Sequence, residues 1–296
     1  MCPGPPRLFP AAAVDGKEVA ASIGIIPIVT VAVDRHLSAA KPGKRPPAYS
    51  MRALGRRNLP ETLTLNGVRW SLLRTHKHDF WAVTGFYENE AGERAVLKMG
   101  RTEPFCGMPM EFIGRWLCRR ELRFYGKLAD LPNVPPVMGQ VGETGFLHAY
   151  APGQPLSRER PVPDGYFNDL LDLMHELHSR GIAYVDANKP ENILVGEDQK
   201  PHLIDFQISF DLQSAGNNRL ARWFHRRFKR ADVYHVLKHK KRMRPDELSE
   251  EELKIVQRRS TLIRVHRFVT WPYFRLRRST FKRLRESGRL LPEGSK

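Results

Sequence analysis

Hydrophobic and polar residues alternate in three successive stretches of the chain after Val68. The stretches read VRWSLLRT, FWAVTGFYE and RAVLKM, and their alternation is typical of strands that bury one face. The segment ENEAGE between the last two has the composition of a turn. The pattern predicts three strands joined by short connections, and the residues from Val137 to Tyr150 predict two more.

Farther along, apolar residues recur at the spacing of a helix. This holds for residues 110–128 and again for residues 166–179, after which Arg180 and Gly181 end the pattern. The short runs NILVG and HLIDF then predict two strands around the turn EDQKP. Beyond Phe210 the chain is expected to be helical. A small sheet with one helix, followed by a mainly helical half, predicts an α+β fold.

The beginning of the chain differs in composition from the rest. Residues 1–57 are rich in Ala, Pro and Gly and end in a basic, proline-broken stretch, so we expect a disordered extension there, with Met51 as a candidate start codon. The apolar run from Val19 to Val33 is shorter than the ~20 residues of a membrane-spanning helix. The folded part of the chain is then expected to form two lobes, one over residues 58–155 and one over residues 156–296.

Charge narrows the range of partners. The formal net charge is +17 at pH 7, and such a chain attracts phosphate-bearing surfaces such as nucleic acid, anionic lipid headgroups or an anionic glycolipid. Cys2, Cys106 and Cys118 are odd in number and lack metal-ligand spacing. Neither a disulfide framework nor a zinc site is therefore expected, and a reducing cytoplasm is the default compartment.

The segment LHSRGIAYVDANKPENILVGEDQKPHLIDFQ contains the residues that can carry chemistry. It resembles the catalytic and metal-binding loops of the protein-kinase superfamily, whose signatures are H-R-D-L-x-x-x-N and D-F-G. The resemblance covers roughly residues 68–210. It implies a two-lobed protein-kinase-like fold, with an antiparallel-sheet N-lobe and a mainly helical C-lobe, that uses ATP and Mg²⁺.

The resemblance also assigns roles to four residues of this segment. Asp186 corresponds to the catalytic base and Lys189 to the lysine that contacts the transferred phosphate. Asn192 and Asp205 correspond to the magnesium ligands. These residue types suit phosphoryl transfer, because a carboxylate can take the proton of the attacking hydroxyl and hard oxygen ligands hold Mg²⁺ against the phosphates.

Two upstream residues are consistent with this pattern. Lys98 in RAVLKM resembles the third-strand lysine of V-A-I-K, which contacts the nucleotide phosphates and pairs with a helix glutamate. Glu121, late in the predicted helix, is favoured as that partner. Glu111 is explained instead by its place at the start of the helix, where a carboxylate suits the helix dipole.

The glycine-rich loop of the superfamily is missing. RTHKHDFWAV stands in its place, with His76, Lys77 and His78 expected at the turn. Lys77 and His78 are candidate donors to the nucleotide phosphates, in place of the backbone N–H groups that glycines would expose. A solvated basic hairpin tip is the equally open alternative.

Three departures from the superfamily pattern indicate which branch of the superfamily the chain resembles. Asp186 and Asn192 are six residues apart instead of five, Tyr184-Val185 replaces His-Arg, and Asp205-Phe206-Gln207 replaces D-F-G. Together these features are most similar to the bacterial lipopolysaccharide-core sugar kinases, which act on heptose or Kdo. That likeness implies a hydroxyl acceptor on an anionic glycolipid.

The region from Arg219 to Arg285 carries most of the excess charge, with 22 Lys and Arg against 6 Asp and Glu, a balance of 22 − 6 = +16. Aromatic residues lie among the arginines, so a peripheral position on an anionic membrane, at the inner face of the cell membrane, is one interpretation. The other is a helical lobe with Trp223, Phe224 and Phe228 in its core.

Two further functions remain as alternatives. One is a protein serine/threonine kinase, although no A-P-E element for peptide docking follows Phe210. The other is a non-enzymatic module, either a pseudokinase or an RNA-binding protein that uses the basic region. The retention of Lys98, Asp186, Asn192 and Asp205 argues against the second, and nucleic acid is the less favoured partner.

Overall fold

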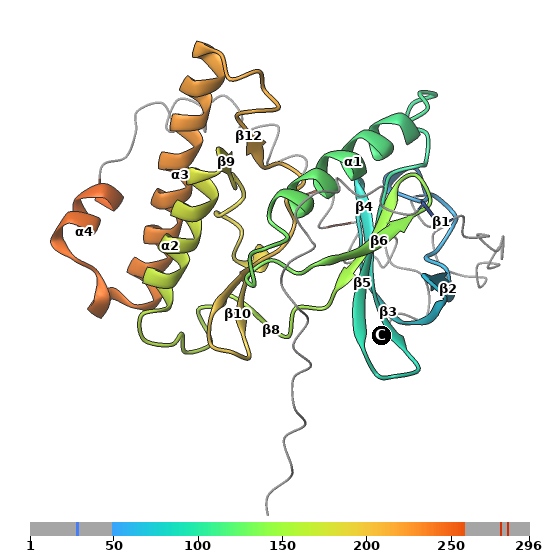
Figure 1. The fold of residues 1–296 in the computed structure, drawn as a ribbon, viewed down its shortest axis with the longest axis horizontal. Helices are drawn as coiled ribbons and strands as arrows, with labels where there is room; N and C mark the ends of the chain where they lie inside the picture. Colours follow the sequence, from blue (N-terminus) through green and yellow to red (C-terminus); the bar gives the residue numbers. More distant parts are fainter. Residues whose placement is uncertain (1–27, 30–48, 258–278, 280–282, 284–296) are drawn as a thin grey trace, which may run out of the picture.

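The computed structural model describes residues 28–29, 49–257, 279 and 283. Figure 1 shows a lobe built on one large sheet and, beside it, a lobe built mainly of helices. The two-lobed α+β fold expected from the sequence is therefore confirmed. Most of the expected extension, residues 1–27 and 30–48, lies outside the described residues.

Seven strands form the sheet of the N-lobe, in the order β1-β6-β7-β5-β4-β3-β2. The short β1 pairs with β6 in parallel, and all other neighbours are antiparallel. The strands are β1 (Ile28–Val29), β2 (Thr62–Leu65), β3 (Val68–His78), β4 (Ala82–Asn89), β5 (Arg94–Gly100), β6 (Val137–Val141) and β7 (Gly145–Ala149).

Alternation of side chains explains the core of this lobe. Trp70 on β3, Tyr87 on β4 and Leu97 on β5 are fully or almost fully buried on the same face of the sheet. The β4–β5 turn forms because the Asn89 side-chain oxygen accepts hydrogen bonds from the N–H groups of Ala91 and Glu93. The buried face and the turn together fix the register between β4 and β5, in which Lys98 is paired with Thr84.

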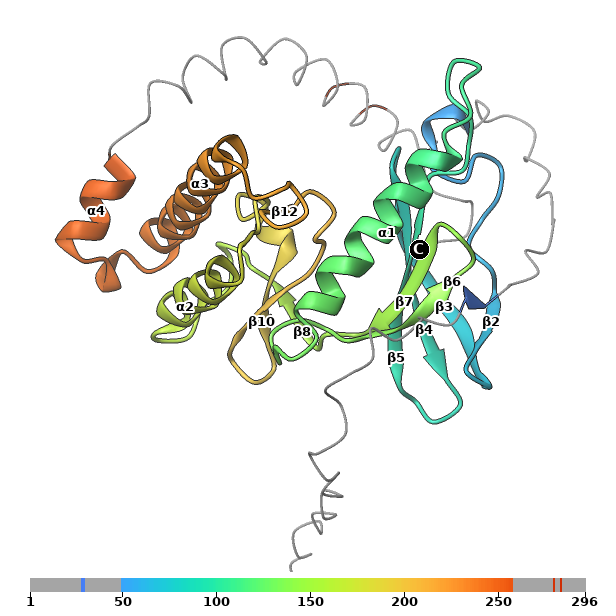
Figure 2. The same ribbon diagram turned by 45° about the horizontal axis from the view of Figure 1, so that its top comes forward.

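A single helix of the N-lobe, α1 (Glu111–Lys127), packs against the sheet next to β5 and β7. Gly114 makes this close approach possible, since a Cβ atom at this position would lie only 2.1 Å from the carbonyl oxygen of Arg101. The packing brings the later turns of α1 over the middle of β5. Figure 2 shows α1 between the sheet and the helical lobe.

Small strands and helices α2 (Tyr166–Ser179) and α3 (Arg219–Met243) make up the C-lobe, and the two helices lie side by side (Figures 1 and 2). The helical spacing of residues 166–179 thus predicted α2 with its observed limits. The remaining elements are β8 (Gly153–Pro155), β9 (Ile182–Ala183), η2 (Pro190–Asn192), β10 (Ile193–Gly196), β11 (Pro201–Leu203), β12 (Phe210–Asp211), η3 (Pro245–Glu247) and α4 (Glu250–Gln257).

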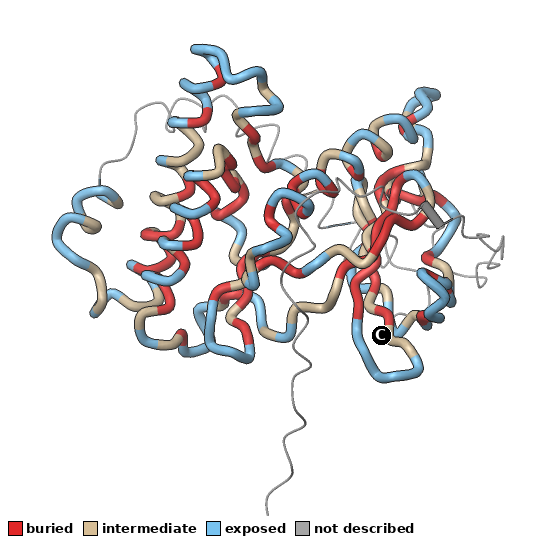
Figure 3. Tube along the Cα trace, viewed as in Figure 1, coloured by how far each residue is buried: buried red, intermediate tan, exposed pale blue. Residues whose placement is uncertain are grey.

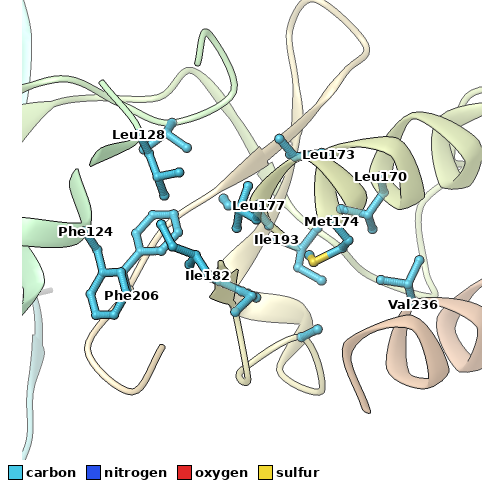
Figure 4. Packing of buried hydrophobic residues seen from close by; sticks show 14 of the residues in the cluster. Phe124, Leu128, Leu170, Leu173, Met174, Leu177, Ile182, Ile193, Phe206 and Val236 are labelled. Carbon is cyan, nitrogen blue, oxygen red and sulfur yellow. The ribbon is translucent and has the colours of Figure 1, made fainter. Parts of the chain in front are cut away.

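One hydrophobic cluster joins the two lobes. Phe124 and Leu128 from α1 pack on Phe206, which follows β11, and the cluster continues through Met174 on α2 to Val236 on α3 (Figure 4). All five side chains are almost completely buried. Because α1 and Phe206 share this core, the sheet lobe and the loop that contains Asp205 are packed as one unit.

Residues 49–57 correct one expectation, because they are packed and do not belong to a disordered extension. They begin with the turn η1 (Tyr49–Met51), and Ala53 and Leu54 are buried against the N-lobe. The buried Arg101 side chain donates to the carbonyls of Ser50, at 2.7 Å, and Phe80, at 2.9 Å. Composition could not reveal this packing, since its partners lie far away in the sequence.

The basic C-terminal region is helical where it is described. α3 begins after Asn218, whose side-chain oxygen accepts a hydrogen bond from the N–H of Ala221 and caps the helix. No helix in the described part of the chain is both long and apolar enough to cross a bilayer. Most of residues 258–285 lie outside that part.

Candidate active site

Lys98 lies between two carboxylates at the boundary of the lobes. Its Nζ atom is 2.8 Å from Glu121 Oε1 on α1 and 2.9 Å from Asp205 Oδ1, which follows β11. The structure therefore joins three predicted site residues from three separate segments. Glu121, and not Glu111, is the helix carboxylate that meets Lys98.

Burial and charge act against each other in this cluster. Burial alone would lower the pKa of Lys98, but the carboxylates of Asp205 and Glu121 more than offset this effect and raise it. Burial would raise the pKa of Asp205, yet the Lys98 ammonium lowers it to about 2. Burial raises the pKa of Glu121, and Lys98 opposes that rise. Lys98 and Asp205 are thus an ion pair at neutral pH.

The hairpin of β10 and β11 brings Asn192 next to Asp205. Ile193 is paired with Leu203 in this hairpin, and the N–H of Ile204 donates to the Asn192 carbonyl at 3.1 Å. Asp205 then leaves the strand with a φ of +64°, a left-handed conformation that is uncommon for any residue but glycine. Such backbone strain is often found at functional sites.

Asp186 lies against Asn192 in the C-lobe. Its Oδ2 atom accepts hydrogen bonds from Asn192 Nδ2 at 2.8 Å and from Lys189 Nζ at 2.6 Å. Burial raises the pKa of Asp186, and Lys189 opposes that rise. The structure therefore groups Asp186, Lys189 and Asn192 at one end of the hairpin and Asp205 beside them.

The extra residue between Asp186 and Lys189 is absorbed by a turn that α3 supports. The N–H of Lys189 bonds back to the Asp186 carbonyl at 3.0 Å. His239 on α3 lies 3.1 Å from the carbonyl of the buried Ala187, and Asn188 points outward. The longer spacing in the sequence thus leaves Asp186 and Asn192 in contact.

Two side-chain oxygen atoms of Asn192 and Asp205 accept no hydrogen bond from the described residues, and they suit a magnesium ion and the phosphates that accompany it. Asn192 uses its amide nitrogen to reach Asp186, and within the described residues no donor bonds its Oδ1. Asp205 bonds Lys98 and the Gln207 N–H through Oδ1, so its Oδ2 is similarly open. One carboxylate and one amide oxygen are the kind of donor set that Mg²⁺ uses together with nucleotide phosphates.

Asp232 on α3 is a positioning residue that the sequence reasoning missed. Its carboxylate accepts the N–H groups of Tyr184, at 2.9 Å, and Val185, at 2.8 Å, and lies 3.0 Å from His178 Nε2. Val185 is held at a φ of +69°, which is strained for a β-branched residue. The signal in the sequence was that Asp232 is the single acidic residue of the strongly basic α3.

Tyr184 has a related role. Its hydroxyl donates toward the carbonyls of Asn192, at 3.2 Å, and Ile204. Its ring packs edge-on against Phe206 with ring centroids 5.4 Å apart. The tyrosine that replaces the superfamily histidine thus holds the segments before and after the hairpin together.

Arg120 is a second residue that the sequence reasoning missed. From α1, beside Glu121, it donates through Nε to the Gln207 carbonyl at 3.2 Å and through Nη2 to the Ser209 carbonyl. These bonds fasten the segment after Asp205 to the helix that carries Glu121. Nothing in CRRELR distinguishes this arginine from its neighbours, because its partners are backbone atoms 87 and 89 residues away.

The β3–β4 hairpin tip corrects the expectation for the missing glycine loop. Residues 76–78 are the end of β3, and the turn is Asp79 to Trp81. His78 is buried, 3.1 Å from Arg52 Nη2, and burial together with the Arg52 charge lowers its pKa to about 3. A neutral, buried imidazole held by other residues is not a phosphate ligand. Lys77 remains half-exposed, in an ion pair with Asp79 at 3.1 Å.

Comparison with known proteins gives a limited sequence match and broader structural ones. No family model matches the chain. The serine/threonine-protein kinase grp of Drosophila melanogaster is 35% identical over 106 residues, which is 33% of this chain and 19% of that protein. The chain therefore spans about a fifth of the length of this curated relative.

Solved structures with kinase folds are similar at low identity. The Rio2 kinase complex with ADP, Mg²⁺ and phosphoaspartate from Chaetomium thermophilum is 18% identical with a TM-score of 0.45, over 64% of this chain and 62% of that one. The BubR1 kinase domain is 15% identical with a TM-score of 0.45, over 62% and 64%. The protein-kinase-like fold of this chain thus rests on its own topology and on the grouping of Lys98, Glu121 and Asp205.

Proposed function

We propose that this protein is an ATP- and Mg²⁺-dependent phosphotransferase that transfers the γ-phosphate to a hydroxyl group. The observation that carries this proposal is the contact of Lys98 with both Glu121 and Asp205, next to the contact of Asp186 with Asn192. A structural ion pair alone would not need an open amide oxygen and an open carboxylate oxygen beside it. Phosphoryl transfer uses all five side chains.

The chemistry follows from what each residue can do. Asp186 accepts the proton of the acceptor hydroxyl while the hydroxyl oxygen bonds to the γ-phosphorus and the bond to the bridging oxygen of ADP breaks. Lys98 and Lys189 bring positive charge to the phosphates, and Glu121 orients Lys98. Asp205 and Asn192 would hold Mg²⁺, which supplies further charge to the nucleotide phosphates.

For the acceptor we propose a sugar hydroxyl of an anionic glycolipid, of the kind found in the lipopolysaccharide core. One support is the resemblance to sugar kinases of this type, to which Tyr184 and Gln207, two of the three departures from the superfamily pattern, contribute. The other is the basic surface of α3. The protein would then work in the cytoplasm, at the inner face of the cell membrane. A protein serine/threonine kinase is the second candidate, favoured by the stretch that is 35% identical to grp.

The test is transfer from ATP labelled at the γ-phosphate, with the full chain offered a core-sugar glycolipid, a serine- and threonine-containing peptide mixture, and RNA. We expect label on the glycolipid only when Mg²⁺ is present. Label on peptide serine or threonine instead would establish the second candidate. Label on no acceptor, at any Mg²⁺ concentration, would contradict phosphotransfer itself.

Two glutamates of α1 provide a matched control. Glu121→Gln should lower transfer by about tenfold or more, because the variant removes the charge that orients Lys98. Glu111→Gln should leave transfer unchanged, since Glu111 is an exposed residue in the first turn of the same helix. Equal effects of the two changes would contradict the assignment of Glu121.

A further inference from the structure

The first turns of α3 carry large apolar side chains that face solvent. Leu220 is 64% exposed, Trp223 50% and Phe224 38%. Of the two interpretations of this region, the one that puts Trp223 and Phe224 in a core is therefore wrong. Figures 1 and 3 show this end of α3 extending beyond α2 at the top of the view, with mostly exposed residues.

The same turns are densely basic. From Arg219 to Arg230 there are six Lys and Arg residues and no Asp or Glu. Within the described chain, the side chains of Arg222, Arg226, Arg227 and Arg230 make no ion pair or hydrogen bond. This differs from the basic residues at the other end of the helix, where Lys240 bonds Glu252 at 2.9 Å.

Helical geometry puts these two groups on one surface. Leu220, Trp223 and Arg227 follow each other at spacings of three and four residues, as do Arg219, Arg222 and Arg226. Trp223, Arg226, Arg227 and Arg230 line a surface hollow of about 290 Å³. The opposite side of the helix is buried through Ala221, His225 and Asp232, so this surface is the one that the other described residues leave uncovered.

We infer that this surface, made of Leu220, Trp223, Phe224 and the arginines around them, docks the protein on an anionic membrane. The unpaired arginines complement lipid phosphates, and the apolar side chains can enter the interface between headgroups and acyl chains. Nucleic acid would satisfy the arginines and stack on the aromatic rings, but it leaves Leu220 without a partner. A lipid surface accounts for both groups.

The inference rests on the proposed function, because docking would bring the protein to a glycolipid acceptor. Binding to a membrane can nevertheless be measured without catalysis. The experiment is flotation of the full chain with vesicles of phosphatidylcholine, with and without phosphatidylglycerol. Wild-type protein should float with the anionic vesicles only, and less as salt rises, because salt screens surface charges. The Arg226→Glu/Arg227→Glu variant should bind at least about tenfold more weakly.

A variant without charge change and two controls make the test specific. Trp223→Ala/Phe224→Ala should also lose flotation while its helical circular dichroism stays that of the wild type. The controls, Arg119→Glu/Arg123→Glu and Phe112→Ala, change exposed residues of α1 and should float like the wild type. Vesicle binding that falls equally in the α1 variants would mean a general charge effect and would overturn the inference.

Two other outcomes would also overturn it. One is wild-type protein that ignores anionic vesicles at low salt, and the other is a chain that shifts single-stranded RNA in a gel but does not float. Catalysis is separable, because Arg226→Glu/Arg227→Glu should keep wild-type transfer to a soluble, deacylated acceptor. Wild-type protein that transfers phosphate but does not float would overturn membrane docking alone. Wild-type protein that floats but transfers phosphate to no acceptor would overturn the proposed function alone.

Discussion

At the scale of single residues, the site depends on a balance between burial and charge. Asp205 stays ionised beside Lys98, with a pKa of about 2, although it is partly buried. Asn192 could offer a cation bound beside Asp205 only a neutral amide oxygen. A hard divalent cation is held far more strongly by a charged oxygen than by a neutral one.

Replacement of these two residues should therefore have unequal effects. We expect Asp205→Ala to weaken binding of Mg-ATP by about tenfold or more, and Asn192→Ala to weaken it less. Isothermal titration calorimetry of both variants, with and without Mg²⁺, measures the difference. An unchanged affinity for Mg-ATP in Asp205→Ala would show that this carboxylate is not a metal ligand.

The resemblance to the kinase signatures was enough to predict that Lys98 would pair with Glu121 and lie in one site with Asp205. Lys98 and Asp205 are 107 residues apart in the sequence and in contact in the structure. His78 shows where such reasoning failed. Its neighbours Lys77 and Asp79 indicated an exposed turn, whereas Arg52, from a segment expected to be disordered, covers it and keeps it neutral.

At the scale of elements, α1 is the part that ties the two lobes together. Arg120 bonds the carbonyls after Asp205, and Lys127 pairs with Asp211 at 2.6 Å, so the helix is fastened twice to the same segment. Gln207 replaces the glycine of the D-F-G signature, and this removes backbone freedom at the same place. Both features favour one fixed position for Asp205.

Removal of the arginine should loosen this arrangement. We expect Arg120→Ala to weaken Mg-ATP binding by about tenfold, because two charge-assisted bonds to the segment after Asp205 are lost. Arg123→Ala is the matched control, since Arg123 is exposed on the same helix. Calorimetry of the two variants should separate them, and equal affinities would show that Arg120 only supports the fold.

Helix and strand limits were largely predictable, and the contacts that hold the site were not. Periodicity gave α2 and the β3, β4 and β5 strands because each buries one face. Arg120 and Asp232 bind backbone groups of distant segments, and backbone donors and acceptors leave no mark on the sequence. Only the isolation of Asp232 in a basic helix indicated a special position.

At the scale of the whole molecule, each lobe positions a different part of the site. The sheet and α1 position Lys98, and the helical lobe positions Asp186, Asn192 and Asp205. α3 has a role on each side. Its buried face holds the segment before Asp186 through Asp232, and its basic face is exposed among the described residues.

The most direct test of this account is the rate of γ-phosphate transfer by Asp186→Asn, measured with the full chain under saturating Mg-ATP. If Asp186 takes the proton of the acceptor, the rate should fall by about 10²–10⁴-fold while the affinity for Mg-ATP stays that of the wild type. Asp169→Asn, a change at an exposed position of α2, should leave both unchanged. Transfer by Asp186→Asn at nearly the wild-type rate would contradict the account.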